Sequence, residues 1–453
     1  MITKNIQSQG YVKPRDRDIT MRSKQDEFSK TAREASTTKT KLTCRNAPPS
    51  PLLFIKSVLI QNAEQEHILD TTEIEGEIMS EGEIMSEGED FPIDDAEDID
   101  DSTNAEEPQQ QQDFVFEDDS VQGFFSHKGS VYTVAINPKD DNIVASGGGD
   151  DIAYVWARDS GEAVFALQKH KDSVISVDFS SSGEYLATAS MDGTVNVYKS
   201  GLDSVYHTFD GPDEIVWIDW HPHGNVFLAG ANDSSIWMFN AVSKSCMNVF
   251  YGHSAPLTCG QFTNSGKNIV SGAEDGSLHI WNPTNGSVIQ KFTSNDKRFH
   301  QDAITCIALN SDDSIILTGS VDNTAKLTHK NGTILGSLEN HTDSIESVGI
   351  SDTNNYAATG SVDGSICIWD INTLRIRNTF RHDDAVTKIK WHKNAPLLTS
   401  ISSDCTARVW DARSGECVRI WKGHQDAILD FALTQDCSSI VTASDDNCCL
   451  VFA

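Results

Sequence analysis

The sequence predicts an all-β fold: an eight-bladed β-propeller that follows a disordered N-terminal tail. One aspartate recurs eight times at steps of 41 to 47 residues, and short apolar runs separated by turn residues fill the chain from residue 121. The first 112 residues lack sustained hydrophobic periodicity. A period near 42 residues with four short strands is typical of a propeller blade. The recurring aspartates are Asp150, Asp192, Asp233, Asp275, Asp322, Asp363, Asp404 and Asp446.

Charge divides the 453-residue chain into three parts. Residues 1–60 carry 12 Lys/Arg against 5 Asp/Glu, and residues 61–120 carry 23 Asp/Glu with no Lys or Arg. High charge with few aromatic side chains cannot offset the entropy cost of ordering. We therefore expect a basic disordered extension at 1–60, an acidic disordered tract at 61–112 and the propeller at 113–453. Ser80 and Ser86 each stand three positions before an acid, a pattern that any acidic tract produces.

Each repeat places further residues at fixed distances from its aspartate. An aromatic residue usually follows by six positions, a Ser or Thr usually precedes by four, and a histidine precedes by 22 or 23 in seven of the eight repeats. Four repeats contain all of these residue types with tryptophan as the aromatic residue. Their members are His127, Ser146, Asp150 and Trp156; His253, Ser271, Asp275 and Trp281; His341, Thr359, Asp363 and Trp369; and His382, Ser400, Asp404 and Trp410.

This pattern resembles the WD40 repeat family, and Trp369-Asp370 and Trp410-Asp411 are literal examples of the dipeptide that names it. The resemblance implies that the four residue types form a structural tetrad, hydrogen-bonded in series inside each blade. Such a buried network stabilises a fold only if each member is satisfied. Gly211 and Ala229 interrupt the series in the third repeat, and Thr328 removes the aromatic residue from the fifth. We expect those blades to depend more on apolar packing.

The ends of the propeller are expected to meet. The last repeat stops at Ala453, directly after its third strand, whereas the other repeats continue into a fourth strand. An unpaired strand edge is unfavourable, so the missing strand must come from elsewhere. The segment before His127 contains several aromatic and aliphatic residues. We therefore assign a strand at about 120–126 to the outer edge of the last blade.

The sequence contains no motif for catalysis, cofactor binding or metal binding, so we expect a non-enzymatic protein that binds other proteins. Gly147–Gly149 could suit a phosphate, but it lies in a strand-to-strand turn with no following helix. The ten cysteines form no CxxC pair. No run approaches the roughly 20 apolar residues that span a bilayer. The charge of −16 over residues 121–453 disfavours direct nucleic-acid binding and favours basic partners.

Acidic residues gather where the propeller's central channel should open. In a WD40 blade, the loop with the histidine and the turn with the aspartate open on the same face. Acids two positions after the histidine are common turn formers, but another set has no such role. This set consists of Glu214, Glu274, Glu346, Asp430 and Asp445. We expect these five acids to bind a partner on this top face, where Lys388 and Lys390 are the exceptions to a uniformly acidic mouth.

The acidic tract followed by eight repeats resembles the angio-associated migratory cell protein family over about residues 61–453. The resemblance is carried by Phe125–His127, Gly148–Asp151, Gly183–Thr188 and Trp220–Pro222. The family's fungal relatives are ribosome-assembly proteins, which implies a chaperone-like escort for the basic N-terminus of a large-subunit ribosomal protein. The alternative is a scaffold or adaptor in signalling, cell migration, angiogenesis or ubiquitin ligation. We expect a monomer located in the cytoplasm and also in the nucleus.

Overall fold

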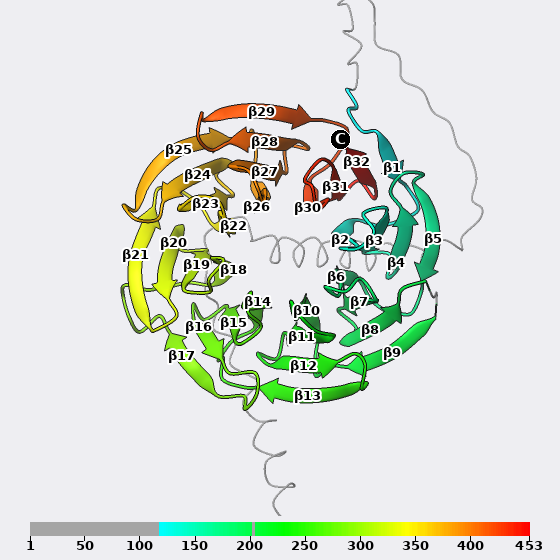
Figure 1. Cartoon of the computed structure of the whole chain (residues 1–453), viewed down its shortest axis with the longest axis horizontal. Coiled ribbons are helices and arrows are strands. Elements are labelled where there is room, and N and C mark those ends of the chain that lie inside the picture. The colour runs from blue at the N-terminus through cyan, green and yellow to red at the C-terminus, as the bar shows by residue number, and fades with distance from the viewer. Residues whose placement is uncertain (1–116, 202–203) are drawn as a thin grey trace, which may run out of the picture. The chain divides into compact units, whose positions relative to one another are not determined.

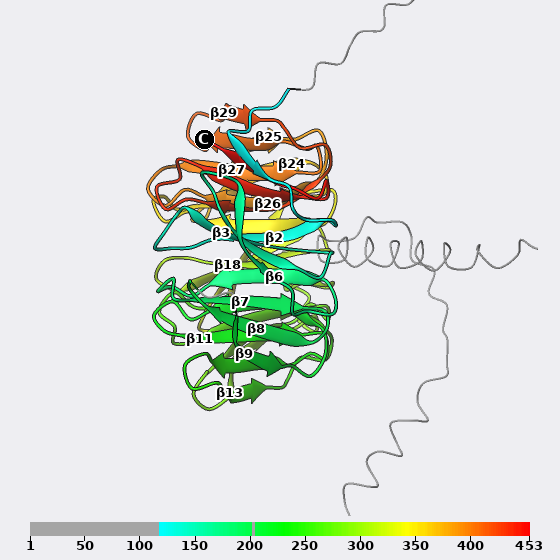
Figure 2. The same ribbon diagram turned by 90° about the vertical axis from the view of Figure 1, so that its right-hand side faces the viewer.

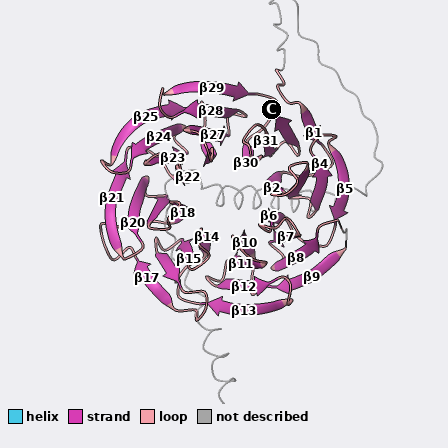
Figure 3. Cartoon of the chain, viewed as in Figure 1, coloured by secondary structure: helices cyan, strands magenta, loops and turns pink. Residues whose placement is uncertain are grey.

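The computed structural model describes residues 117–201 and 204–453 and confirms the predicted eight-bladed β-propeller. Eight four-stranded antiparallel sheets follow one another around a ring (Figure 1). Every regular element of the described residues is a strand (Figure 3). The predicted disordered segments 1–60 and 61–112 lie outside the described residues.

Each blade runs from an inner strand at the channel to an outer strand at the rim. Blades 1 to 4 contain β2 (Val131–Ile136), β3 (Ile143–Gly148), β4 (Ala153–Ala157) and β5 (Glu162–Leu167); β6 (Val174–Phe179), β7 (Tyr185–Ser190), β8 (Thr194–Lys199) and β9 (Val205–Asp210); β10 (Ile215–Trp220), β11 (Val226–Ala231), β12 (Ile236–Asn240) and β13 (Ser245–Phe250); and β14 (Leu257–Phe262), β15 (Ile269–Ala273), β16 (Leu278–Trp281) and β17 (Val288–Phe292). Blades 5 to 8 contain β18 (Ile304–Leu309), β19 (Ile315–Ser320), β20 (Thr324–His329) and β21 (Thr333–Glu339); β22 (Ile345–Ile350), β23 (Tyr356–Ser361), β24 (Ser365–Asp370) and β25 (Arg375–Arg381); β26 (Val386–Trp391), β27 (Leu397–Ser402), β28 (Ala407–Asp411) and β29 (Glu416–Trp421); and β30 (Ile428–Leu433), β31 (Ile440–Ser444), β32 (Cys449–Phe452) and β1 (Gln122–Phe124).

The hydrophobic core lies between the blades rather than at the centre of the ring. The described residues form eight buried clusters, and each cluster joins side chains of two neighbouring blades. The middle strands are therefore buried on both faces, as in β7, where every residue is buried. Each outer strand pairs with only one other strand of its sheet and is more exposed. In β29 the last residue, Trp421, is the only buried one. Stacking blades thus buries surface that a single blade would leave exposed.

The last blade is completed by the N-terminal strand β1, which lies beside β32 (Figure 1). The other blades are built from consecutive strands, as Figure 2 shows for β6, β7, β8 and β9. Gln122, Gly123 and Phe124 pair with Val451, Leu450 and Cys449. Of the two aromatic residues in the assigned segment 120–126, Phe124 is 0% exposed and Phe125 is 70% exposed. Alternate residues of a strand point to opposite faces, and only one face of β1 meets the neighbouring blade.

Hydrogen bonds between inner strands also hold the ring together. The hydroxyl of Thr133 accepts a bond from the backbone N–H of Val177 in the next blade, at 3.3 Å. The hydroxyl of Thr387 donates to the carbonyl of Ile428 at 2.7 Å. Because these bonds use side chains at the channel, the inner strands keep a defined spacing around it.

Candidate protein-binding face

The predicted tetrads of blades 1, 6 and 7 form hydrogen-bonded series. In blade 7 the two imidazole nitrogens of His382 lie 2.9 Å from an oxygen of Asp404 and 2.7 Å from the hydroxyl of Ser400. The indole N–H of Trp410 donates to the same hydroxyl at 2.8 Å. Burial alone would raise the pKa of Asp404, but its interactions with His382, together with hydrogen bonds from Thr406 and the Asp383 backbone, lower that pKa. Corresponding bonds join His127, Ser146, Asp150 and Trp156, and His341, Thr359, Asp363 and Trp369.

Blade 4 departs from the predicted series. His253 bonds to Ser271 at 2.7 Å, and Trp281 donates to Ser271 at 2.8 Å. The other nitrogen of His253 faces the hydroxyl of Ser277 at 2.8 Å instead of Asp275. The ring of the fully buried His279 stacks on His253 with 3.9 Å between centroids. Burial lowers the pKa of His253 to about 4 and that of His279 to about 3, so both rings are neutral at neutral pH.

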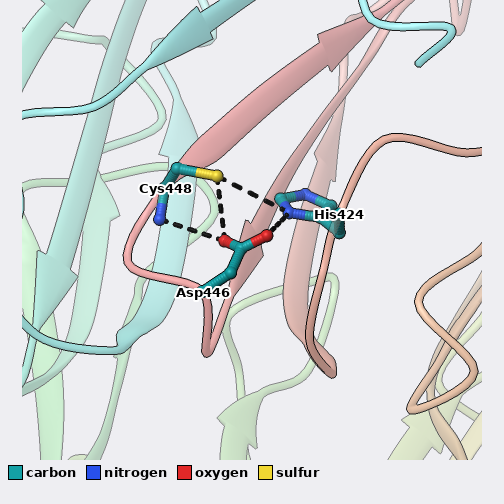
Figure 4. A group of neighbouring side chains, drawn as sticks. All are labelled: His424, Asp446 and Cys448. Carbon is teal, nitrogen blue, oxygen red and sulfur yellow. Dashed lines mark hydrogen bonds and ion pairs between the residues drawn. The ribbon is translucent and has the colours of Figure 1, made fainter. Parts of the chain in front are cut away.

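In blade 8 a cysteine takes a position where most other blades have Ser or Thr (Figure 4). The Cys448 thiol lies 2.8 Å from an oxygen of Asp446, and the other Asp446 oxygen lies 2.8 Å from His424. His424 also bonds to Thr442 at 2.7 Å. A His, an Asp and a Cys this close could in principle ligate a metal. However, burial raises the pKa of Cys448, and the thiol acts as a hydrogen-bond donor within the blade's tetrad.

One side of the ring carries the loops before the inner strands and the turns between the second and third strands, and we call this side the top face. Three of the five predicted binding acids lie there in half-buried positions. Glu214 precedes β10 and accepts a hydrogen bond from the Asn232 side chain at 3.4 Å. Glu274 and Asp445 follow β15 and β31. The hydroxyl of Ser130 donates to Asp445, whose pKa is raised by burial.

The other two predicted acids, Glu346 and Asp430, are not free charges at the channel mouth. Glu346 is the second residue of β22 and is 6% exposed, and burial raises its pKa to about 8. Asp430 is the third residue of β30, is 9% exposed and pairs with Lys388. It also accepts the backbone N–H of Val134 at 3.0 Å. Both residues lie within inner strands, past the loops that form the mouth, and neither is an exposed acid of the top face. Their contact with a partner stays a prediction.

Most of the turn-forming acids do contribute charge to the top face. One carboxylate oxygen of each accepts the backbone N–H of the next residue at 2.7 to 2.9 Å. Their side chains nevertheless remain exposed. The residues concerned are Asp172, Asp213, Asp302, Asp384 and Asp426. A role in the turn therefore does not remove an acid from the surface charge, and the acidic face extends beyond the five predicted residues.

The wall of the channel carries charges that the sequence patterns did not identify as a site. A cavity of about 390 Å³ is bounded by β2, β6, β26 and β30, and Asp178, Lys388, Lys390 and Asp430 line it. Burial raises the pKa of Asp178 to about 7 and that of Asp219 to about 8. Asp178, Asp219 and Lys390 each hold the fifth position of an inner strand. A comparison of the fifth position of the inner strands across the repeats could have identified these charged residues from the sequence.

The sequence profile of the WD40 family, described as "WD domain, G-beta repeat", matches eight segments of the chain. They are residues 119–157, 161–199, 203–240, 244–282, 291–328, 332–370, 374–411 and 415–452. The chain belongs to the WD40 family. WD40 propellers are typically non-enzymatic binding scaffolds, and the top face is the part of this one where exposed acids gather. Among the described residues, no helix is long and apolar enough to cross a membrane.

Within the WD40 family, the chain is 34% identical to the human (Homo sapiens) angio-associated migratory cell protein over 351 residues, covering 74% of the chain and 80% of the relative. It therefore belongs to that family of WD40 proteins. Identity to the ribosome assembly protein SQT1 of Saccharomyces cerevisiae is 27%, over 74% of the chain and 86% of that relative. The crystal structure of Chaetomium thermophilum Sqt1 bound to the N-terminus of ribosomal protein L10 matches with a TM-score of 0.70. That match has 29% identity and covers 74% of the chain and all of the Sqt1 chain.

Proposed function

We propose that this protein is an escort that holds the basic N-terminal segment of a large-subunit ribosomal protein on its acidic top face. The observation that carries the proposal is the similarity to Sqt1, whose solved structure holds the N-terminus of ribosomal protein L10. Ribosomal proteins are made in the cytoplasm. We therefore expect this protein to be located in the cytoplasm and also in the nucleus. The proposed escort acts as a monomer.

The charge distribution supports a basic partner. Glu214, Glu274 and the exposed turn acids all lie on the top face, on a propeller whose residues 121–453 carry a charge of −16. Clustered charge of one sign accelerates encounter with a segment of opposite charge. Each solvated ion pair contributes only about 0–1 kcal/mol, so binding must be spread over several contacts.

The test is calorimetry of the full chain with the N-terminal peptide of the L10-class ribosomal protein from the same organism. Affinity should fall between about 50 and 200 mM salt, because salt screens exposed charges. The double change Glu214→Lys with Glu274→Lys should weaken binding by at least about tenfold, since it adds repulsion as well as removing attraction. Glu346 and Asp430 are unsuitable for this test, because one is buried with a raised pKa and the other is already paired.

A matched control reverses two exposed acids on the opposite side of the ring. Glu162 is the first residue of the outer strand β5, and Asp352 follows the end of the inner strand β22. Both positions lie on the side of the ring opposite the top face. Glu162→Lys with Asp352→Lys changes the net charge by the same amount and should leave affinity within about twofold. Equal losses from both double variants would mean that only net charge matters. If neither salt nor either double variant changes the affinity for the peptide, the adaptor function would be favoured instead.

A further inference from the structure

Two lysines stand on the channel wall of a propeller whose residues 121–453 carry a net charge of −16. Lys388 and Lys390 are the third and fifth residues of β26, so their side chains leave the same face of this inner strand. Both line the cavity of about 390 Å³ that opens between β26, β30, β2 and β6. Residues of β2, from Tyr132 to Ile136, also line this cavity.

The two lysines differ in how their charge is satisfied. Lys388 forms an ion pair with Asp430, the residue at the same position of the neighbouring inner strand. Among residues 117–201 and 204–453, no carboxylate oxygen lies within 4.0 Å of the Lys390 ammonium group. Lys390 is exposed to the open channel. Desolvation by the surrounding strands and the charge of Lys388 lower its pKa, and Asp430 and Asp178 oppose this effect. The channel therefore holds one ammonium group that an added anion would stabilise.

We propose that Lys390, assisted by Lys388, binds a single carboxylate group inside the central channel. A dianion such as phosphate fits less well, because the carboxyl groups of Asp430, which pairs with Lys388, and Asp178 also line the cavity. One negative charge matches the one ammonium group that lacks a partner. The carboxylate comes from an acidic side chain in the segment held on the top face or from a free small carboxylate. A carboxylate from the bound segment rests on the proposed function. In that case the basic segment also carries an acidic residue at a defined position.

The peptide arm of the test uses the full chain and a series of synthetic peptides measured by calorimetry. The parent peptide contains Lys, Arg, Gly and Ser, and each further peptide places one Glu at the next position along it. A glutamate normally weakens binding to an acidic face, but at one position it should strengthen binding by about fivefold, the size of a partly solvated ion pair. Lys390→Met should abolish this gain without lowering the melting temperature.

Lys171→Met is the matched control. Lys171 is an exposed lysine in the top-face loop before β6, so its loss changes the net charge equally without touching the channel. This variant should keep the preferred glutamate position. Lys388→Met is not informative alone, because it also frees Asp430 to attract basic residues.

The second arm titrates carbon-13 acetate and follows its carboxyl signal by NMR. Acetate binding that Lys390→Met removes, with no preferred glutamate position, supports a free carboxylate as the ligand. If no peptide binds but acetate binding still depends on Lys390, the proposed function fails and the carboxylate site stands. If basic peptides bind and Lys390→Met changes neither the glutamate preference nor acetate binding, the carboxylate site is wrong.

Discussion

Closure of the ring depends on the side chain of Phe124, and the neighbouring Phe125 provides a control for this claim. Phe124 is fully buried, and its ring is stacked on that of Trp156 with 5.0 Å between centroids and 6° between planes. It also meets Tyr154 edge-on at 5.3 Å. Phe125 is 70% exposed, although it has the same composition and lies one position away.

The expected cost of Phe124→Ala follows from these contacts. Full burial of a phenylalanine contributes about 1.5–3 kcal/mol, and aromatic pairs add about 0.5–1.5 kcal/mol. The sum of about 2–4.5 kcal/mol agrees with the roughly 3–5 kcal/mol typical of Phe→Ala changes in cores. Phe125→Ala should change the free energy of unfolding by less than about 0.5 kcal/mol.

Urea unfolding followed by tryptophan fluorescence measures both variants directly. Because Phe124 joins β1 to blades 1 and 8, its loss should lower the midpoint for the whole ring and should not produce a separate early transition. Equal midpoints for Phe124→Ala and Phe125→Ala would refute the assignment of β1 as the strand that closes the propeller.

Three further predictions follow from the polar groups inside the ring. Asp363→Ala should destabilise the protein by about 1 kcal/mol more than Asp322→Ala in chemical denaturation, because the series in blade 6 extends to the Trp369 indole; the opposite order would contradict the tetrad interpretation. Although burial opposes it, bonding to Asp363 raises the pKa of His341 to about 9, whereas burial lowers that of His300. The contribution of His341 to the free energy of unfolding should thus be fully present below its ordinary pKa near 6.5 and should be lost as the pH rises through about 9. An NMR titration in which the pKa of His341 lies below that of His300 would contradict this prediction. Glu346 has a raised pKa of about 8 and a buried oxygen without a partner, so Glu346→Met should raise the free energy of unfolding by about 1–3 kcal/mol at pH 8 and by less at pH 5; a loss of stability at pH 8 would show that the carboxyl is needed.

The architecture could be predicted from the repeat pattern because the residues that identify each blade lie within a single repeat. The Ser or Thr and the aromatic residue lie on adjoining strands of one blade and the aspartate lies in the turn between them, so their spacing is visible along the chain. The need for a strand near 120–126 was equally readable, since the last repeat lacks a fourth strand. Blade 4 shows the limit of this reasoning, because Ser277 and His279 altered the bonding of His253 without changing the pattern.

The electrostatic state of the channel was decided only by the tertiary structure. Glu346 and Asp430 read as equivalent acids, yet one has a pKa raised by burial and the other is paired with a lysine 42 residues away. Lys388 and Lys390 are two residues apart, yet among residues 117–201 and 204–453 Lys388 pairs with a carboxylate and Lys390 does not. Whether a charged group is solvated, paired or desolvated depends on neighbours from other blades, and these meet only when the ring closes. The sequence alone thus determines which residues are charged, and the closed ring determines which of them remain available to a partner.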